Sequence, residues 1–287
     1  MTMMKKTGLL LSAVMVTAWQ AGCIVVSSSG GCWGLGQAQQ TATSELTIEA
    51  SGLLGLDVRT HNGRVSYTGA DSSTIVVSAK KTGRGLTSAD AKAALDAIKV
   101  YVEDTGSGRK KLAWRWSTPK HATWSGGVSF SISGPENLGL DVESHNGGID
   151  VEGVAGDVKA ITHNGAVVTS TANGSLTVET HNGRIETAYS GPSITLASYN
   201  GGVSADLSGC GSVVGDIRTH NGGIRVTVGP STASEIDCET NNGGIHADST
   251  INVRKVSQRR LKATLGAGGS PLKVRSYNGG IHLKKVG

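Results

Sequence analysis

The chain alternates apolar and polar residues in short segments that recur around an Asn-Gly pair. When each copy is numbered from its Asn, the positions four and six residues earlier are almost all apolar. The odd positions between them carry mostly charged or polar side chains. The third position after the Asn is β-branched in every copy: Val65, Ile149, Val167, Ile185, Val203, Ile224, Ile245 and Ile281. A period of two is typical of a β-strand with one buried face, so each Asn-Gly pair is predicted to join two strands.

The Asn-Gly pairs recur at regular intervals. From Asn146 to Asn200 successive copies are 18 residues apart, and the next two steps are 21 residues. Coils stacked in parallel would place like residues in columns about 4.8 Å apart, which an antiparallel meander would not do. We therefore predict an all-β fold, a single-stranded parallel β-solenoid (β-helix) with two-strand rungs of about 18 residues. The bends are predicted at Asn62, Asn146, Asn164, Asn182, Asn200, Asn221, Asn242 and Asn278, each followed by a Gly that takes a positive φ.

Two other β-helical folds fit the repeat less well. A left-handed hexapeptide helix needs an aliphatic residue every six positions, but the third position before the Asn holds charged residues such as Arg59, Glu143 and Arg218. Pectate-lyase-like β-helices have longer rungs with three sheets, so an 18-residue rung favours the two-strand solenoid.

Residues 66–140 do not follow the repeat. They contain a helix-start signature, in which Thr87 caps the helix and Asp90 reaches back to the cap. Two strands are predicted afterwards, at residues 100–103 and 112–116. An open solenoid end exposes unpaired strand edges, and natural ends are covered. We therefore interpret this segment as a small α+β insert that caps or braces the solenoid.

Three of the five Trp residues lie in this insert, at Trp114, Trp116 and Trp124. Alternation places Trp114 and Trp116 on the same face of a strand. One interpretation is that their rings pack the helix onto the sheet. The other is an exposed aromatic platform that stacks on sugar rings or seats an envelope protein.

The N-terminus predicts export. Residues 1–22 contain two lysines and an apolar run that is too short to span a membrane, which is typical of a signal peptide. Small residues before Cys23 resemble a lipoprotein cleavage site, so Cys23 is the predicted lipidation site, with an ordinary signal peptide cut elsewhere as the alternative. Ile24 after the Cys favours the outer membrane or cell surface. Residues 23–45 are predicted to be a flexible tether and residues 46–287 the solenoid domain.

Composition limits the partners and the covalent links. The 287 residues carry a net charge of +5 without a long basic stripe, so nucleic acid is not an expected partner. Aromatic residues make up 4% of the chain, which suits a thin aliphatic core. Export permits a disulfide, and Cys210 with Cys238 is the candidate pair. However, Cys238 also falls on a predicted core column, where a free Cys acts as a small hydrophobe.

The position before the Asn is usually His and points outward. His145, His163, His181 and His220 would therefore form a column of imidazoles that could bind Zn²⁺ or Cu²⁺. Because Tyr199 and other planar residues also occupy this column, stacking is the favoured interpretation, and no metal or other cofactor is assigned. The Asn column and the Thr or Ser column two residues before it are expected to form hydrogen-bonded ladders.

No set of residues predicts catalysis. A pair of outward carboxylates such as Asp141 and Glu143 is expected on any strand with a solvated face. The chain has neither a phosphate-binding Gly-rich loop nor the His and Cys spacing of a zinc site. We therefore predict that the protein is not an enzyme and has no catalytic residues.

The repeats and the ending Leu272-Lys273-Val274-Arg275-Ser276-Tyr277-Asn278-Gly279-Gly280-Ile281 resemble the bacterial putative-adhesin family of β-strand-repeat (Asn-Gly repeat) domains, here in a lipoprotein. The resemblance covers residues 45–287, except that an expected Asn-Gly bend is missing near residues 258–260. It implies an exported or membrane-attached β-solenoid with no established activity. The expected function is adhesion, envelope structure or scaffolding. The alternatives are a carbohydrate-binding or carbohydrate-active β-helix protein, such as a polysaccharide lyase or hydrolase, and metal binding by the His column.

Overall fold

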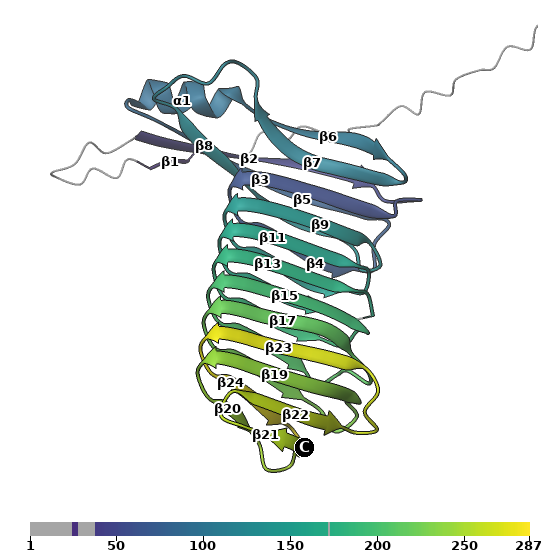
Figure 1. Ribbon diagram of the computed structural model, residues 1–287. Helices are drawn as coiled ribbons and strands as arrows, with labels where there is room; N and C mark the ends of the chain where they lie inside the picture. The colour runs from purple at the N-terminus through teal and green to yellow at the C-terminus, as the bar shows by residue number, and fades with distance from the viewer. Residues whose placement is uncertain (1–24, 28–37, 172) are drawn as a thin grey trace, which may run out of the picture.

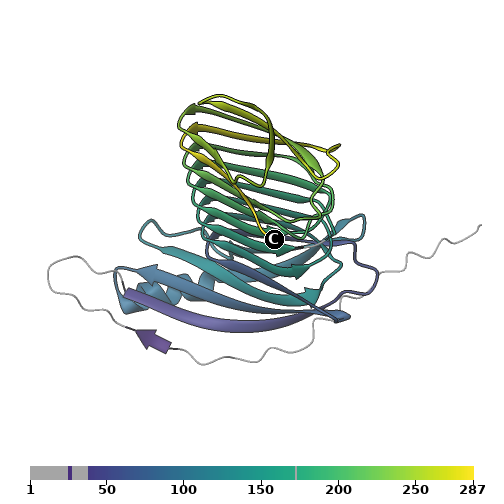
Figure 2. The same ribbon diagram turned by 90° about the horizontal axis from the view of Figure 1, so that it is seen from below.

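A computed structural model describes residues 25–27, 38–171 and 173–287. These residues are almost entirely β, with one helix among them, and the strands form two large mixed sheets of 12 strands each. The sheets face each other in a long stack, and the helix α1 lies at the end formed by the N-terminal half of the chain (Figure 1). Figure 2 shows that the strands of this end, coloured purple to blue, spread wider than the stack. The all-β prediction is confirmed.

The central repeats each contribute one strand to each sheet. The strands that end at the Asn lie in sheet B: β9 (Gly139–Asn146), β11 (Val158–Asn164), β13 (Leu176–Asn182), β15 (Ser193–Asn200) and β17 (Val214–Asn221). The strands that follow the Asn-Gly pair lie in sheet A: β10 (Ile149–Val154), β12 (Val167–Thr171), β14 (Ile185–Tyr189), β16 (Val203–Leu207) and β18 (Ile224–Val228). Neighbouring strands pair in parallel, and each Asn is in register with the next. The sequence period therefore becomes a set of columns along the stack.

The core lies between the two sheets and is filled by the predicted apolar columns. Leu196 and Val178 from sheet B and Ile185 from sheet A have no exposed surface. Each such aliphatic side chain contributes about 1.5–3 kcal/mol when fully buried. Three aromatic rings are buried among the described residues, Tyr67 and Phe130 at the N-terminal end and Tyr189 on β14. A sandwich this thin is filled by aliphatic residues, which explains why the chain contains so few aromatic residues.

Hydrogen-bonded side chains connect the bends. In each step of what we call the Asn ladder, Nδ2 of one Asn donates to Oδ1 of the next at 2.8 Å, and the order is Asn242, Asn278, Asn221, Asn200, Asn182, Asn164, Asn146 and Asn62. The last amide, that of Asn62, donates to the carbonyl oxygen of Gly126 at 3.1 Å. The Thr or Ser two residues earlier is buried and donates to a backbone carbonyl of the neighbouring repeat, as Thr180 does to Gly165 at 3.0 Å. The predicted Asn ladder is confirmed, and the Thr or Ser column hydrogen-bonds beside it, to backbone carbonyls rather than to its own members.

The glycines at the bends have a different purpose from the predicted one. None of the glycines that directly follow a bend Asn has a positive φ. Instead, a Cβ at Gly183 would clash with the carbonyl oxygen of Gly165, and one at Gly201 would clash with that of Gly183. Gly is required there because the backbones of stacked bends approach too closely for a side chain, so the positive-φ prediction was wrong.

The N-terminal end is covered by strands outside the repeat. The repeat strands β3 (Gly55–Asn62) and β4 (Val65–Ala70) come first in the stack. The covering elements are β5 (Thr74–Gly85), α1 (Ser88–Ala97), β6 (Ile98–Gly106), β7 (Arg109–Trp116) and β8 (Ser125–Pro135). Strand β7 pairs in parallel with β3 in sheet B, and β8 pairs in parallel with β4 in sheet A. The first repeat is therefore covered in both sheets at this end. The predicted capping box of Thr87 and Asp90 is present at α1.

Part of the predicted tether is a strand. Residues 38–45 lie in β2 (Ala38–Glu49), which pairs in antiparallel fashion with β5 along its whole length and with the short β1 (Val25–Ser27). The prediction of a tether up to residue 45 was wrong, because backbone pairing with β5 forms a strand there although the residues are mostly polar and half-buried. The other residues of that segment, 23–24 and 28–37, lie outside the described residues.

The C-terminal repeat breaks the sequence order of the stack. It consists of β23 (Pro271–Asn278) and β24 (Ile281–Lys285). Strand β23 lies between β17 and β19 (Ser234–Asn242), and β24 lies between β18 and β20 (Ile245–Ala247). The irregular segment near residues 258–260 joins β21 (Asn252–Val256) to β22 (Arg260–Leu265), and β22 pairs in antiparallel fashion with β19 at the end of sheet B.

Candidate functional site

The outer face of sheet B carries a groove of about 1650 Å³. Its lining residues come from β6 and from the nine strands β7, β3, β9, β11, β13, β15, β17, β23 and β19, so the groove runs across the strands. The outward columns at the first and third positions before each Asn form its lining. The groove thus follows from the sequence repeat, since like side chains recur at every strand crossing.

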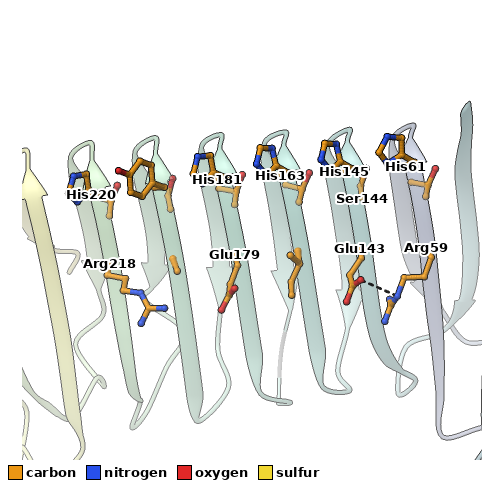
Figure 3. A pocket seen from close by; sticks show the side chains of 18 of the residues that line it. Arg59, His61, Glu143, Ser144, His145, His163, Glu179, His181, Arg218 and His220 are labelled. Atoms are coloured by element: carbon orange, nitrogen blue, oxygen red, sulfur yellow. Dashed lines mark ion pairs between the residues drawn. The ribbon is translucent and has the colours of Figure 1, made fainter. Parts of the chain in front are cut away.

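One side of the groove is a continuous stack of rings, which we call the ring ladder. Its members in order are His61, His145, His163, His181, Tyr199, His220 and Tyr277. Successive ring centroids are 4.6–4.9 Å apart, and from His145 to Tyr277 the planes lie within 10° of parallel. Figure 3 shows the rings in a row at the bends of successive strands. The stacking prediction is confirmed, and because each ring covers its neighbour's face, the ladder presents ring edges.

The ring spacing does not suit a shared metal ion. Two nitrogen ligands of one Zn²⁺, each about 2.0–2.1 Å from the metal, are at most about 4.2 Å apart. In parallel rings the equivalent nitrogens are separated by about the ring spacing, which is 4.9 Å for His145 and His163 and 4.8 Å for His163 and His181. Within the described residues, no group of three or more His, Cys, Asp or Glu side chains is placed to hold a metal ion. The geometry favours stacking over metal binding.

The floor of the groove is the column at the third position before the Asn. In strand order it holds Arg59, Glu143, Ile161, Glu179, Ala197, Arg218, Arg275 and Glu239. Arg59 pairs with Glu143 at 3.3 Å, and Figure 3 shows this ion pair at one end of the row. Arg218 and Arg275 both pair with Asp216, at 3.1 and 2.6 Å. The floor therefore mixes both signs of charge with two apolar residues, and its three Arg residues are each paired with a carboxylate on the same face.

The N-terminal end of the groove is aromatic. Trp114 and Trp116 line it, and both are half-buried because they also pack against the core. Their rings meet edge to face at 5.7 Å, and the Trp114 indole donates from Nε1 to Thr60 Oγ1 at 3.2 Å. Tyr101 lies there too, with the Arg115 guanidinium 5.0 Å from its ring centroid. The two indoles therefore pack against the core and border the groove. The helix α1 contacts mainly β5 and β2, so packing of the helix by these rings stays a prediction, as does a ligand platform.

The third predicted platform residue is one step away. The ring centroids of Trp124 and Trp116 are 6.3 Å apart, and Trp124 is not among the residues that line the groove. Tyr101 and Arg115 were not singled out from the sequence. Arg115 had no clear signal in the sequence, because β7 buries the consecutive residues Leu112 and Ala113. Only the pairing of β6 with β7 places Tyr101 and Arg115 beside each other. On the same hairpin, the hydrogen bond to Glu103 raises the pKa of Lys111.

The candidate disulfide is not formed. Cys210 and Cys238 are both free and buried. Cys238 occupies the core column of β19, as its sequence position suggested, whereas Cys210 lies in a bend and donates from Sγ to the carbonyl oxygen of Tyr189 at 3.2 Å. Burial raises the pKa of Cys210 to about 11 and that of Cys238 to about 12. Each sulfur thus has its own packing site. The lipidation candidate Cys23 lies outside the described residues.

Comparison with known proteins finds only remote similarity. No family model matches the chain, and no curated protein matches it. A putative cell adhesion protein from Clostridium sporogenes is 12% identical, with 86% of this chain and 100% of that chain covered and a TM-score of 0.35. A putative adhesin from Bacteroides fragilis is 13% identical, with 85% of this chain and 97% of that chain covered and a TM-score of 0.46. A putative adhesin from Parabacteroides merdae is 10% identical, with 86% of this chain and 96% of that chain covered and a TM-score of 0.45. Similarity at this level assigns neither a family nor a function to the chain.

Proposed function

We propose that the protein is a non-enzymatic, adhesin-like binding protein of the cell envelope, built as a parallel β-solenoid with two-strand rungs. The observation that carries this proposal is the groove on sheet B, which is long, open and lined by the same two columns at every strand. Such a surface suits contact with an extended ligand better than enclosure of a small molecule, for which pockets of about 300–1000 Å³ are typical. A scaffolding role in the envelope would use the same face.

The proposed location is the outer membrane or cell surface, with lipid on Cys23 as the anchor. Support comes from the N-terminal sequence, with an apolar run followed by small residues and Cys. None of the helices among the described residues is long and apolar enough to cross a membrane. A lipid at Cys23 would hold the stack on the membrane through the residues that precede β2.

The competing function is a carbohydrate-active enzyme. A glycosidase needs two carboxyl groups on either side of the scissile bond. The groove carries Glu143 and Glu179 on strands separated by β11, but Glu143 is paired with Arg59 and both carboxylates continue the ordinary outward column. The arrangement therefore favours binding. Release of reducing ends or unsaturated products from a polysaccharide incubated with the full chain would contradict this proposal.

Adhesion by whole cells tests the proposed function. The full chain is produced in a bacterial host with an outer membrane, and attachment of the cells to mucus-coated and polysaccharide-coated surfaces is measured. Ala197→Arg places a long side chain in the middle of the groove, at a column that already holds Arg59, Arg218 and Arg275. Ser204→Arg is the matched control on the outer face of sheet A, next to Arg225 in the register.

We expect Ala197→Arg to reduce attachment while Ser204→Arg leaves it unchanged. Cys23→Ser tests the anchor separately, because it should move the protein from the membrane fraction to the soluble exported fraction. Equal attachment by cells with and without the protein would rule out an adhesive role. Retention of the Cys23→Ser variant in the membrane would rule out the lipid anchor.

A further inference from the structure

The shape of the groove fits a linear polymer. It crosses nine strands, and with strands about 4.8 Å apart its length is roughly 40 Å. A planar ring recurs at each crossing from His61 to Tyr277, so a ligand with its own repeat would meet the same kind of side chain along most of its length. A single small molecule would fill only part of this surface.

The charges of the groove cancel locally. Its cations are Arg59, Lys111, Arg115, Arg218 and Arg275, and its carboxylates are Glu143, Glu179 and Glu239. Three further carboxylates beside the groove, Asp141, Asp216 and Glu103, pair with four of these cations. Five cations thus face six carboxylates. A polyanion such as nucleic acid or an acidic polysaccharide would gain little from such a surface, because its attraction to the cations is opposed by repulsion from the carboxylates.

The groups that remain are suited to hydroxyls. The ring ladder presents the edges of imidazole and phenol rings, which donate and accept hydrogen bonds, rather than apolar faces. Guanidinium and carboxylate groups held in ion pairs offer planar, fixed hydrogen-bonding geometry. At one end, Trp114, Trp116 and Tyr101 add aromatic surface. Polar edges along the chain with aromatic surface at one end match a ligand that carries hydroxyl groups and apolar C–H faces.

We propose that the groove binds a linear, uncharged polysaccharide, whose chain lies across the strands with one end against Trp114 and Trp116. This inference rests on the proposed binding function and adds the chemical class of the ligand. The ring ladder and the floor contact successive sugar units, so binding strengthens with every unit until the groove is full. An extended peptide is disfavoured because the floor offers only Ile161 and Ala197 as apolar contacts for alternate side chains.

Chain-length dependence is the test. Binding of the purified full chain is measured by calorimetry with cello-, manno-, xylo- and malto-oligosaccharides, each from the disaccharide to the octasaccharide. For at least one series we expect the octasaccharide to bind about tenfold or more tightly than the disaccharide, with little dependence on salt. Polygalacturonate and single-stranded DNA serve as the charged comparison probes.

Ala197→Arg divides the groove and provides the decisive variant. It should weaken octasaccharide binding by about tenfold or more, while a disaccharide bound at the Trp end keeps its affinity. Ser204→Arg, on the same repeat but the opposite face, should bind every length as the unchanged protein does. We expect both variants to fold, because each new Arg lies beside an existing one in the register, Arg218 next to position 197 and Arg225 next to position 204. Unchanged melting temperatures check this.

A second pair of variants removes polar contacts instead. Glu179→Ala with Arg218→Ala removes one carboxylate and one guanidinium from the floor. Glu186→Ala with Arg225→Ala removes the same two groups from the same repeats on sheet A. We expect the first pair to weaken the octasaccharide about tenfold and the second to have no effect.

Three results would overturn the proposed ligand. One is the absence of binding by all four neutral series, and another is affinity that does not change with chain length. The third is tighter, salt-sensitive binding of polygalacturonate or DNA. If cell attachment still depends on Ala197 in any of these cases, the binding function stands and only the ligand class is wrong. If attachment is also independent of Ala197, the proposed function fails with it.

Discussion

Asn278 donates a hydrogen bond from Nδ2 to Oδ1 of Asn221 at 2.8 Å, although 57 residues separate them in the chain. Asn242, which belongs to the repeat directly after that of Asn221, bonds to Asn278 instead. The last repeat of the chain is therefore inserted between the two repeats before it. The β21–β22 hairpin covers the repeat that was moved outward, so the C-terminal end of sheet B is closed by an antiparallel strand.

The inserted order can be tested with engineered cysteines. Arg218 and Arg275 are paired in the parallel register, so their Cα atoms are about 4.8 Å apart, within the range that a disulfide spans. Arg218→Cys with Arg275→Cys should form a disulfide on mild oxidation. Arg218→Cys with Glu239→Cys should not, because β23 lies between the two strands.

Non-reducing electrophoresis after proteolysis distinguishes these outcomes, with Cys23 and Cys32 replaced by Ser in both variants. A disulfide in the second variant and none in the first would mean that the repeats stack in sequence order. The buried thiols of Cys210 and Cys238 remain in both, so they form an internal reference.

The Asn ladder predicts a graded loss of stability. Asn182→Ala removes two ladder hydrogen bonds, whereas Asn242→Ala removes one because Asn242 only donates. At about 0.5–1.5 kcal/mol for each bond, we expect a loss of about 1–3 kcal/mol for the first variant and about half of that for the second. Urea unfolding followed by circular dichroism measures both. Equal losses would show that the ladder amides do not act as individual links.

Close packing at the bends predicts that substitutions of two glycines in successive bends have very different effects on stability. Gly183→Ala would push a methyl group into the carbonyl oxygen of Gly165, so we expect a loss of about 2–3 kcal/mol or more. A methyl carbon at Gly202 would lie 3.4 Å from its nearest neighbour, the carbonyl oxygen of Gly223. Gly202→Ala should therefore change the melting temperature little. Similar effects at both sites would argue against close approach as the reason for Gly183.

Acid should loosen the C-terminal cap. The hydrogen bond from Arg260, which lies on β22, lowers the pKa of Asp237 on β19. A carboxyl group with a lowered pKa in the folded state stabilises the fold above its unfolded pKa of about 3.9, and this contribution is lost as the pH falls through the folded value. Asp237→Asn should thus destabilise the protein at pH near 7 by less than about 1 kcal/mol, because the pair is partly exposed.

The difference between Asp237→Asn and the unchanged protein should disappear as the pH falls below about 4. Thermal unfolding at a series of pH values measures this difference. A destabilisation that persists unchanged in acid would mean that Asp237 contributes through packing rather than through its charge.

The two buried cysteines predict a clear thiol titration. Because burial raises the pKa of Cys238 to about 12, its reactive thiolate is scarce at neutral pH, and access is blocked as well. In a variant with Cys23 and Cys32 replaced by Ser, a thiol reagent should find no reactive group in the folded protein. Two thiols should become reactive in denaturant. None in denaturant would mean that Cys210 and Cys238 are joined in the exported protein.

The strands and columns of the stack could largely be predicted, because each repeat is a continuous segment of the sequence. The columns that contain Ile185, His163 and Asn182 follow from strand alternation and a fixed period alone. Strand β8 was not predicted, because its Gly and Ser residues hide the buried positions of Val128 and Phe130.

Other features depend on contacts between distant segments. Nothing near Asn278 in the chain indicates that Asn221 is its neighbour, since the column chemistry is the same at every repeat. The groove likewise needs β7 to lie beside β3, which the residues around Trp114 do not specify by themselves. The glycine at each bend was predicted in place, but its purpose depends on the neighbouring backbone and is not visible in one repeat.

The inserted last repeat has a consequence for how this architecture varies in length. Both ends of the stack are specialised, one by β7 and β8 and the other by the β21–β22 hairpin, while the middle repeats are interchangeable. Duplication or loss of one 18-residue unit between Asn146 and Asn200 would lengthen or shorten the outer face by one strand without changing either cap. The length of the outer face of sheet B can thus change in evolution by one strand at a time.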